Sequence, residues 1–227
     1  WYQGANLHRS VVGAINGQLS WLGEAMTWTA AVDARSEGIL SNRLGLLVNE
    51  NSDYAFEDDR LNIDAYVSGK YFGAGDRLAV TATMAVNENS RFGSSLLPAL
   101  NARMAFGRGD QIVVFGSAGR SVRHPSFTDL YYILGGAVGS EDLKSEYADQ
   151  GEIGGRWNIS ALQSSHQFSI ETTRFIRQGR DLIDWVQFDG SDLYEATNVA
   201  EVDFFGGDVS MLYQRAESTE QFYVRSA

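Results

Sequence analysis

Residues 59–72 read DRLNIDAYVSGKYF, and their side chains alternate between apolar and polar along the stretch. The odd positions are mainly apolar and the even positions mainly polar, which is a period of two residues. A strand with one apolar and one polar face has this period, whereas a helix repeats every 3.6 residues. The tight-turn sequence GAGD follows at 73–76, and the alternation resumes at 77–87 with RLAVTATMAVN. The two stretches predict an antiparallel hairpin.

The same hairpin unit recurs along the chain and predicts about ten strands in five hairpins. The connections between these strands alternate in length. Short turns are expected near residues 22–24, 73–76, 107–110, 160–165 and 214–219. Long connections are expected near residues 36–58, 88–96, 122–146 and 178–198.

Two features distinguish these strands from those of an ordinary β-sandwich. They are about 10 to 15 residues long, while strands in globular proteins average about 5 to 6. Short turns on one rim and long loops on the other are typical of an outer-membrane β-barrel. The sequence therefore predicts an all-β fold, namely part of an antiparallel transmembrane β-barrel. Its apolar face would contact lipid and its polar face would line an enclosed aqueous interior.

The composition of the two faces agrees with a barrel. The polar face is rich in Thr, Ser, Asn, Ala, Asp and Arg, which suits a wet interior. Four aromatic residues near strand ends on the apolar face are expected to form an interfacial girdle: Trp21, Trp28, Tyr71 and Trp157. The alternative is a soluble antiparallel β protein, such as a β-sheet binding protein or a lectin. In such a protein the apolar faces would pack against one another.

The composition also argues against several kinds of function. The formal net charge is −11, and binding to nucleic acid would require a basic face. The chain has no cysteine, and its three histidines (His8, His124 and His166) lie far apart, so we expect neither thiolate chemistry nor a histidine-built metal site. No GxSxG element is present, and no enzymatic activity is predicted. No cofactor is expected to be required, although calcium in extracellular loops is left open.

An aromatic-rich segment interrupts the strand pattern within residues 121–157, SVRHPSFTDLYYILGGAVGSEDLKSEYADQGEIGGRW. Its apolar residues show neither helical nor strand periodicity, so we expect a loop. Phe127 and Leu130 are expected to pin this loop against its neighbours. Tyr131, Tyr132 and Leu134 are candidate ligand-binding residues, because aromatic faces supply contact area to a flat, bulky ligand.

The same segment closely resembles a signature of TonB-dependent outer-membrane receptors. In that family an Arg-x-Pro-(Ser/Thr)-(Phe/Leu)-x-(Asp/Glu)-Leu-Tyr element leaves the barrel, and a second element leads into the next strand. The matching residues are Arg123, Pro125, Ser126, Phe127, Asp129, Leu130, Tyr131 and Tyr132, followed by Leu143, Lys144, Glu146, Glu152 and Gly154. Ser145 stands where the second element usually has proline. Residues 33–45, 89–106 and 180–211 resemble further passages of the cobalamin and siderophore branch, particularly in Bacteroidetes-type receptors.

The resemblance covers nearly the whole chain and implies that residues 1–227 are part of a barrel of about 22 strands. The plug domain, the first strands and the closing strand would lie outside this sequence. The implied function is TonB-dependent uptake of a bulky, scarce nutrient across the bacterial outer membrane. Cobalamin or another corrinoid is the first choice of nutrient, a ferric siderophore or haem the second, and a glycan the third. The implied partners are a TonB-type energising protein acting through the plug, a surface lipoprotein lid, and outer-membrane lipid and lipopolysaccharide.

Two polar-face arginines, Arg103 and Arg123, are expected to join the network of the barrel interior that holds a plug.

Overall fold

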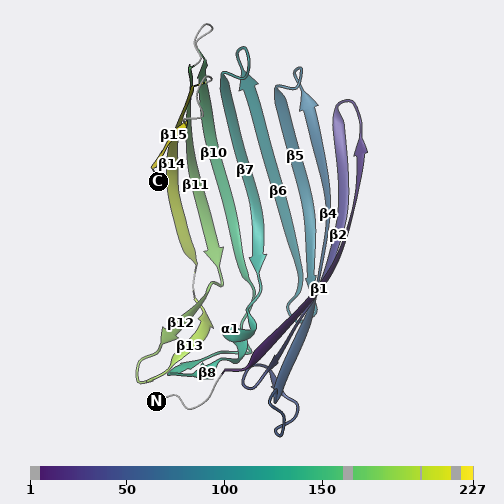
Figure 1. The fold of residues 1–227 in the computed structure, drawn as a ribbon, viewed down its shortest axis with the longest axis vertical. Helices are drawn as coiled ribbons and strands as arrows, with labels where there is room; N and C mark the ends of the chain where they lie inside the picture. The colour runs from purple at the N-terminus through teal and green to yellow at the C-terminus, as the bar shows by residue number, and fades with distance from the viewer. Residues whose placement is uncertain (1–5, 161–165, 200, 216–220, 227) are drawn as a thin grey trace.

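The computed structural model describes residues 6–160, 166–199, 201–215 and 221–226, and most of them belong to one large antiparallel sheet (Figure 1). Ten strands lie side by side in the order β1-β2-β4-β5-β6-β7-β10-β11-β14-β15, and the short β3 (Leu46–Leu47) pairs with β4. Their bounds are β1 (His8–Leu22), β2 (Met26–Ser41), β4 (Phe56–Gly73), β5 (Leu78–Asn89), β6 (Gly93–Phe106), β7 (Ile112–Arg123), β10 (Glu146–Ser160), β11 (His166–Arg180), β14 (Val202–Arg215) and β15 (Gln221–Ser226). The all-β prediction of about ten strands in hairpins is confirmed.

A smaller sheet lies beyond one end of the large one, at the bottom of Figure 1. It has the order β12-β13-β9-β8 and is made of β8 (Ile133–Leu134), β9 (Ala137–Val138), β12 (Ile183–Gln187) and β13 (Tyr194–Asn198). A one-turn helix, α1 (Phe127–Tyr131), lies at the same end. No helix in the described ranges is long and apolar enough to span a membrane.

The strand register sorts the side chains of the large sheet into two faces. One face, here called the apolar face, carries a continuous series of aliphatic residues that includes Val32, Val67, Met84, Leu100, Val114 and Ile153. These residues are exposed: Met84 is 50% and Ile153 is 64% accessible. The opposite, polar face carries residues such as Thr83, Asn101 and Ser117. Because the apolar side chains do not pack against a second layer, the soluble-sandwich alternative does not fit the fold.

The aromatic residues predicted for a girdle lie on the apolar face near the short turns. Trp21 is paired with Trp28 across β1 and β2. The Trp28 ring covers Gly69 of β4, where an added Cβ would lie 2.8 Å from the ring. Tyr71 and Trp157 are similarly exposed near the same ends of β4 and β10. This placement is the one expected of an interfacial aromatic belt.

The two ends of the large sheet differ as predicted, with one exception. The turns 23–25, 74–77 and 107–111 lie at one end, here called the short-turn end, while the predicted turns at 160–165 and 214–219 fall mostly on residues outside the described ranges. The connections 42–55 and 124–145 and the described residues of the connection 181–201 lie at the other end, here called the long-connection end.

The long connection predicted near residues 88–96 is wrong. β5 and β6 are joined by only three residues, 90–92. The side-chain oxygen of Asn89 accepts hydrogen bonds from the backbone N–H groups of Arg91 and Phe92, at 2.9 and 3.0 Å. Gly93 then adopts a φ of +75°, which a residue without a Cβ tolerates. A local side-chain turn therefore closes the hairpin where the sequence pattern suggested a loop.

Candidate functional site

Residues 124–145, here called the insert, connect β7 to β10 and contain the helix that the periodicity argument missed. Ser126 is the N-cap of α1: the Asp129 N–H donates to Ser126 Oγ at 3.1 Å, and the Ser126 N–H donates to Asp129 Oδ2 at 2.8 Å. This reciprocal pair is a capping box, which stabilises the first turn of a helix. The Ser-x-x-Asp spacing was visible in the sequence and could have predicted the helix, because a single turn needs a cap more than an apolar stripe.

Arg60 attaches the start of the insert to the polar face of the large sheet. From its position on β4 it donates through Nη1 to the Pro125 carbonyl at 2.5 Å, and its guanidinium lies 4.9 Å from the centre of the Phe127 ring. Arg60 also forms an ion pair with Glu37 of β2 at 2.8 Å. The side chains of Arg60 and Glu37 are only 12% and 16% exposed, so this pair is largely removed from solvent.

A second attachment joins α1 to the turn between β5 and β6. The Tyr131 hydroxyl donates to Asp58 Oδ2 at 2.7 Å, and Arg91 donates to both the Tyr131 hydroxyl and the same carboxylate. Burial, followed by the hydrogen bond to Asp58, raises the pKa of Tyr131 above its ordinary value. The hydroxyl therefore remains protonated and serves as a donor at neutral pH.

His124 forms the third attachment and is held in one tautomer. The Asn87 amide donates to Asp64 at 2.8 Å, so the Asn87 oxygen accepts from His124 Nε2, also at 2.8 Å. Ser145 Oγ then donates to Nδ1 at 2.7 Å, and the ring stacks on Phe92. Burial, followed by the positive charge of Arg60, lowers the pKa of His124 below its ordinary value, against the opposing effect of Asp64 and Glu37. The neutral ring is thus the form that fits the folded insert.

The insert lies on a buried apolar cluster at the long-connection end. Its buried members are Ile39, Leu44, Leu130, Tyr131, Leu143 and Ala196, and it is extended by Phe92, Phe127, Tyr132, Ile183 and Trp185. Leu130 is 2% exposed and Phe127 packs against the cluster, which agrees with the pinning role expected for both residues.

The three candidate ligand-binding residues occupy different environments. Tyr131 is 6% exposed, with its hydroxyl already hydrogen bonded, so its position suits support of the insert. Tyr132 is half-buried and meets Trp185 edge to face at 6.0 Å. Leu134 is half-buried in β8. Contact between these residues and a ligand stays a prediction.

A polar hollow of about 430 Å³ lies beside the insert and is here called the arginine hollow. Its lining includes Arg35 of β2, Arg60 of β4 and Arg123 of β7, together with Asn62, Asp64, Asn87, Leu97, Arg120, Ser121, Val122 and His124. Arg35 pairs with Glu37 at 2.6 Å and Arg123 with Glu146 at 2.5 Å, and both arginine side chains are about half exposed, so part of each guanidinium group remains accessible. Such groups can bind a carboxylate, a phenolate or a phosphate through paired N–H donors.

The sequence alone does not identify the arginine hollow. It predicts only that Arg123 and Arg103 belong to a network inside the barrel. The structure places Arg123 in the hollow, whereas Arg103 pairs with Asp110 at 2.6 Å near the short-turn end. The sequence signal that could have identified the hollow is that Arg35, Arg60 and Arg123 all occupy polar-face positions near the long connections.

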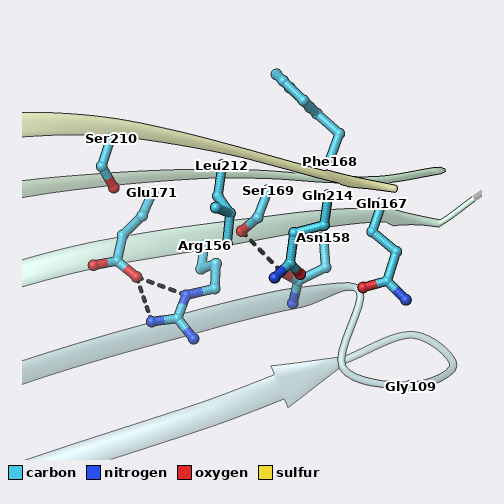
Figure 2. Close-up of a pocket in the computed structure, with 10 residues that line it drawn as sticks. All are labelled: Gly109, Arg156, Asn158, Gln167, Phe168, Ser169, Glu171, Ser210, Leu212 and Gln214. Carbon is cyan, nitrogen blue, oxygen red and sulfur yellow. Dashed lines mark hydrogen bonds and ion pairs between the residues drawn. The ribbon is translucent and has the colours of Figure 1, made fainter. Parts of the chain in front are cut away.

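A second hollow, of about 550 Å³, lies on the polar face near the short-turn end (Figure 2). Arg156 pairs with Glu171 across β10 and β11, at 2.5 Å. Beside that pair, Ser169 donates to the Asn158 side-chain oxygen at 2.9 Å. The neighbouring Gln167 and Gln214 are uncharged, and the only charges in this lining neutralise each other. Its composition suits a hydrated interior wall.

The described residues contain no group of three or more His, Cys, Asp or Glu side chains arranged to hold a metal ion. Calcium in the long connections stays a prediction.

Comparison with known proteins identifies the fold. The family model for the TonB dependent receptor-like β-barrel matches residues 1–225. The siderophore receptor PirA from Pseudomonas aeruginosa has a similar structure, with a TM-score of 0.75 and 15% identity over 96% of this chain and 41% of that one. A variant of the ferric enterobactin receptor PfeA from the same organism, in complex with enterobactin, has a TM-score of 0.69 and 12% identity over 91% of this chain and 34% of that one. The FrpB iron transporter from Neisseria meningitidis has a TM-score of 0.64 and 14% identity over 91% of this chain and 33% of that one.

The chain thus spans about one third to two fifths of the length of these solved structures, and no curated protein matches it. The family match covers almost every residue, and the exposed apolar face, the girdle and the alternation of turn lengths are the features of such a barrel. The chain belongs to the TonB-dependent receptor β-barrel family.

Proposed function

We propose that residues 1–227 form part of the barrel wall of an outer-membrane importer that takes up a bulky nutrient with energy delivered by a TonB-type protein. Two features of the sheet support this reading: aliphatic side chains are exposed on the apolar face of strand after strand, and the polar face carries polar side chains around a hollow. The energising protein would act through the plug domain of such a receptor. No catalytic role is proposed for any residue.

We further propose that the nutrient is an anionic ferric chelate of the siderophore class. The observation that carries this choice is the arginine hollow, in which Arg35, Arg60 and Arg123 converge from three strands beside the insert. Ferric siderophores commonly present clustered oxygen donors with net negative charge, which guanidinium groups bind strongly in a partly desolvated site. A corrinoid, the first choice from sequence resemblance, has no comparable observation in its favour. The names of the three similar structures point in the same direction.

The long-connection end would face the outside of the cell and would be the place for a surface lipoprotein lid. Ile133 of β8 and Tyr194 of β13 are exposed there and would be available to such a partner.

The cargo can be tested by ligand binding to the full-length gene product in detergent, with ferric enterobactin, a ferric hydroxamate, ferric citrate and cyanocobalamin as ligands. We expect one ferric chelate to bind. Replacing Arg35 and Arg123 together with glutamine should weaken that binding about a hundredfold, because a hydrogen bond to a charged group contributes about 1.5 to 3 kcal/mol. Because Arg123 is also the partner of the largely buried Glu146, the amount of folded double variant in the outer-membrane fraction is measured alongside its affinity.

Arg103→Gln is the matched control, because Arg103 is also a polar-face arginine in an ion pair but lies near the short-turn end. It should leave the affinity unchanged. Tight binding of cyanocobalamin without binding of any ferric chelate would overturn the choice of cargo, as would equal affinities in the double variant and the wild type.

A further inference from the structure

Arg120, Asp149 and Arg180 form a cluster of charged side chains on the apolar face, toward its long-connection border. Arg120 of β7 shares a face with Val114, and Asp149 of β10 shares one with Ile153, because each pair is separated by an even number of residues. Arg120 is directly opposite Asp149 in the register, and Arg180 of β11 is on the same face one row farther along. The side chains of this trio therefore project from the same side of the sheet as the aliphatic series, and of the three residues Arg120 also borders the arginine hollow.

The trio lies near the edge of the lipid-contacting band. Arg120 follows Ile112 by eight residues, and Asp149 precedes Trp157 of the girdle by the same number. Eight residues of strand span about 26 Å, which is about 20 Å along the membrane normal at a tilt near 40°. The apolar band of outer-membrane barrels is about 25 Å tall. With the girdle at one border, the trio lies about 5 Å inside the other, a distance over which the long arginine side chains can extend to the outer-leaflet headgroups.

The trio carries two positive charges and one negative charge, and its arginines have N–H groups that do not bind Asp149. Arg120 binds the Asp149 carboxylate through Nε and Nη2, at 2.7 and 3.0 Å, and Arg180 binds the same carboxylate. Two guanidinium groups thus share one acid. Their remaining N–H groups are open to solvent, because Arg120 is 38% exposed, Arg180 is 43% exposed and Asp149 is 34% exposed. The next acid on this face is Asp203 of β14. It is two strands away from Asp149 in the same row of the register, with Gln178 of β11 between them.

We propose that Arg120 and Arg180 bind a phosphate group of the anionic glycolipid that forms the outer leaflet, with Asp149 holding the two guanidinium groups in position. A phosphate accepts paired N–H donors from arginine in the geometry that a carboxylate does, and it would replace water on the free edges of both groups. The inference rests on the proposed membrane orientation and adds a defined lipid site to it. The Arg156–Glu171 pair differs because it is one-to-one and lies on the polar face (Figure 2), where lipid has no access.

The test is native mass spectrometry of the full-length receptor extracted from outer membranes in the presence of EDTA, which removes bridging divalent cations. We expect wild-type receptor to retain the phosphorylated glycolipid and the R120Q/R180Q variant to retain at least tenfold less. R120K/R180K, which keeps the charges but loses the paired donors, should be intermediate. R156Q should match the wild type. In delipidated receptor, the phosphorylated lipid A should bind, whereas its dephosphorylated form and phosphatidylglycerol should bind at least tenfold more weakly.

Equal retention by wild type and R120Q/R180Q would overturn the site, and so would equal binding of phosphorylated and dephosphorylated lipid A. A preference for phosphatidylglycerol would overturn the choice of glycolipid. Ferric chelate binding is measured on the same preparations, so the two proposals can fail separately. If R120Q/R180Q binds the chelate normally and retains all of its glycolipid, only the lipid-site proposal is contradicted. If the receptor is absent from the outer-membrane fraction, the proposed function itself is contradicted.

Discussion

Replacing Met84 with arginine is expected to lower the free energy of unfolding of the full-length receptor in lipid vesicles by about 2 to 4 kcal/mol. Met84 lies near the middle of β5 on the apolar face and is half exposed. If that face contacts hydrocarbon, the guanidinium must be buried in lipid or must distort the bilayer around it. On a water-soluble protein the same exposed position would accept arginine with a change within about 0.5 kcal/mol. Denaturant titration of the reconstituted receptor measures the difference.

The neighbouring residue provides the control. Thr83 has nearly the same depth on β5 but points to the polar face, where its hydroxyl donates to Ser68 at 3.0 Å. Thr83→Arg removes that hydrogen bond, so we expect a cost of about 1 kcal/mol. A loss for Met84→Arg no larger than that for Thr83→Arg would mean that the apolar face is not in contact with lipid.

Replacing Arg60 with methionine is expected to release the insert from the large sheet. The substitution keeps much of the side-chain volume but removes the hydrogen bond to Pro125, the contact with Phe127 and the ion pair with the largely buried Glu37. Glu37 keeps Arg35 as a partner at 2.6 Å, so we expect a local cost of about 2 to 3 kcal/mol rather than the full cost of an unpaired buried charge. Hydrogen exchange of residues 124–145 should accelerate about a hundredfold.

Arg156→Met is the corresponding control, because it breaks an ion pair of the same type on the same face far from the insert. Its exchange rates in 124–145 should equal those of the wild type. Unchanged exchange in Arg60→Met would show that the apolar cluster alone holds the insert and that Arg60 does not anchor it.

The strands were predictable from sequence because the alternation that identifies them is local. Each residue of β4 shows by its polarity which face it occupies, and neighbouring strands repeat the pattern independently. The turn at 90–92 was missed because its cause is one side chain, Asn89, which caps two backbone N–H groups. The helix α1 was missed because five residues are too few for a periodicity, although Ser126 and Asp129 marked its start.

The candidate site was less predictable because it depends on contacts between residues far apart in the chain. Arg60 and Pro125 are 65 positions apart, and Tyr131 and Asp58 are 73 apart. The motif around Tyr131 indicated the family, but nothing local indicated that its hydroxyl is satisfied inside the protein. The arginine hollow is built from three strands, and its existence follows only from their order and register.

The central claim is that the apolar face of the large sheet contacts lipid and the polar face lines an aqueous interior. Because residues 1–227 contain no cysteine, single cysteines can be placed at successive positions from 78 to 88 of β5 and labelled with an environment-sensitive fluorophore. In the receptor reconstituted in vesicles, we predict that a lipid-attached quencher acts at the even positions and a water-soluble quencher at the odd ones. Even positions shielded from both quenchers, as in a packed protein core, would contradict the account.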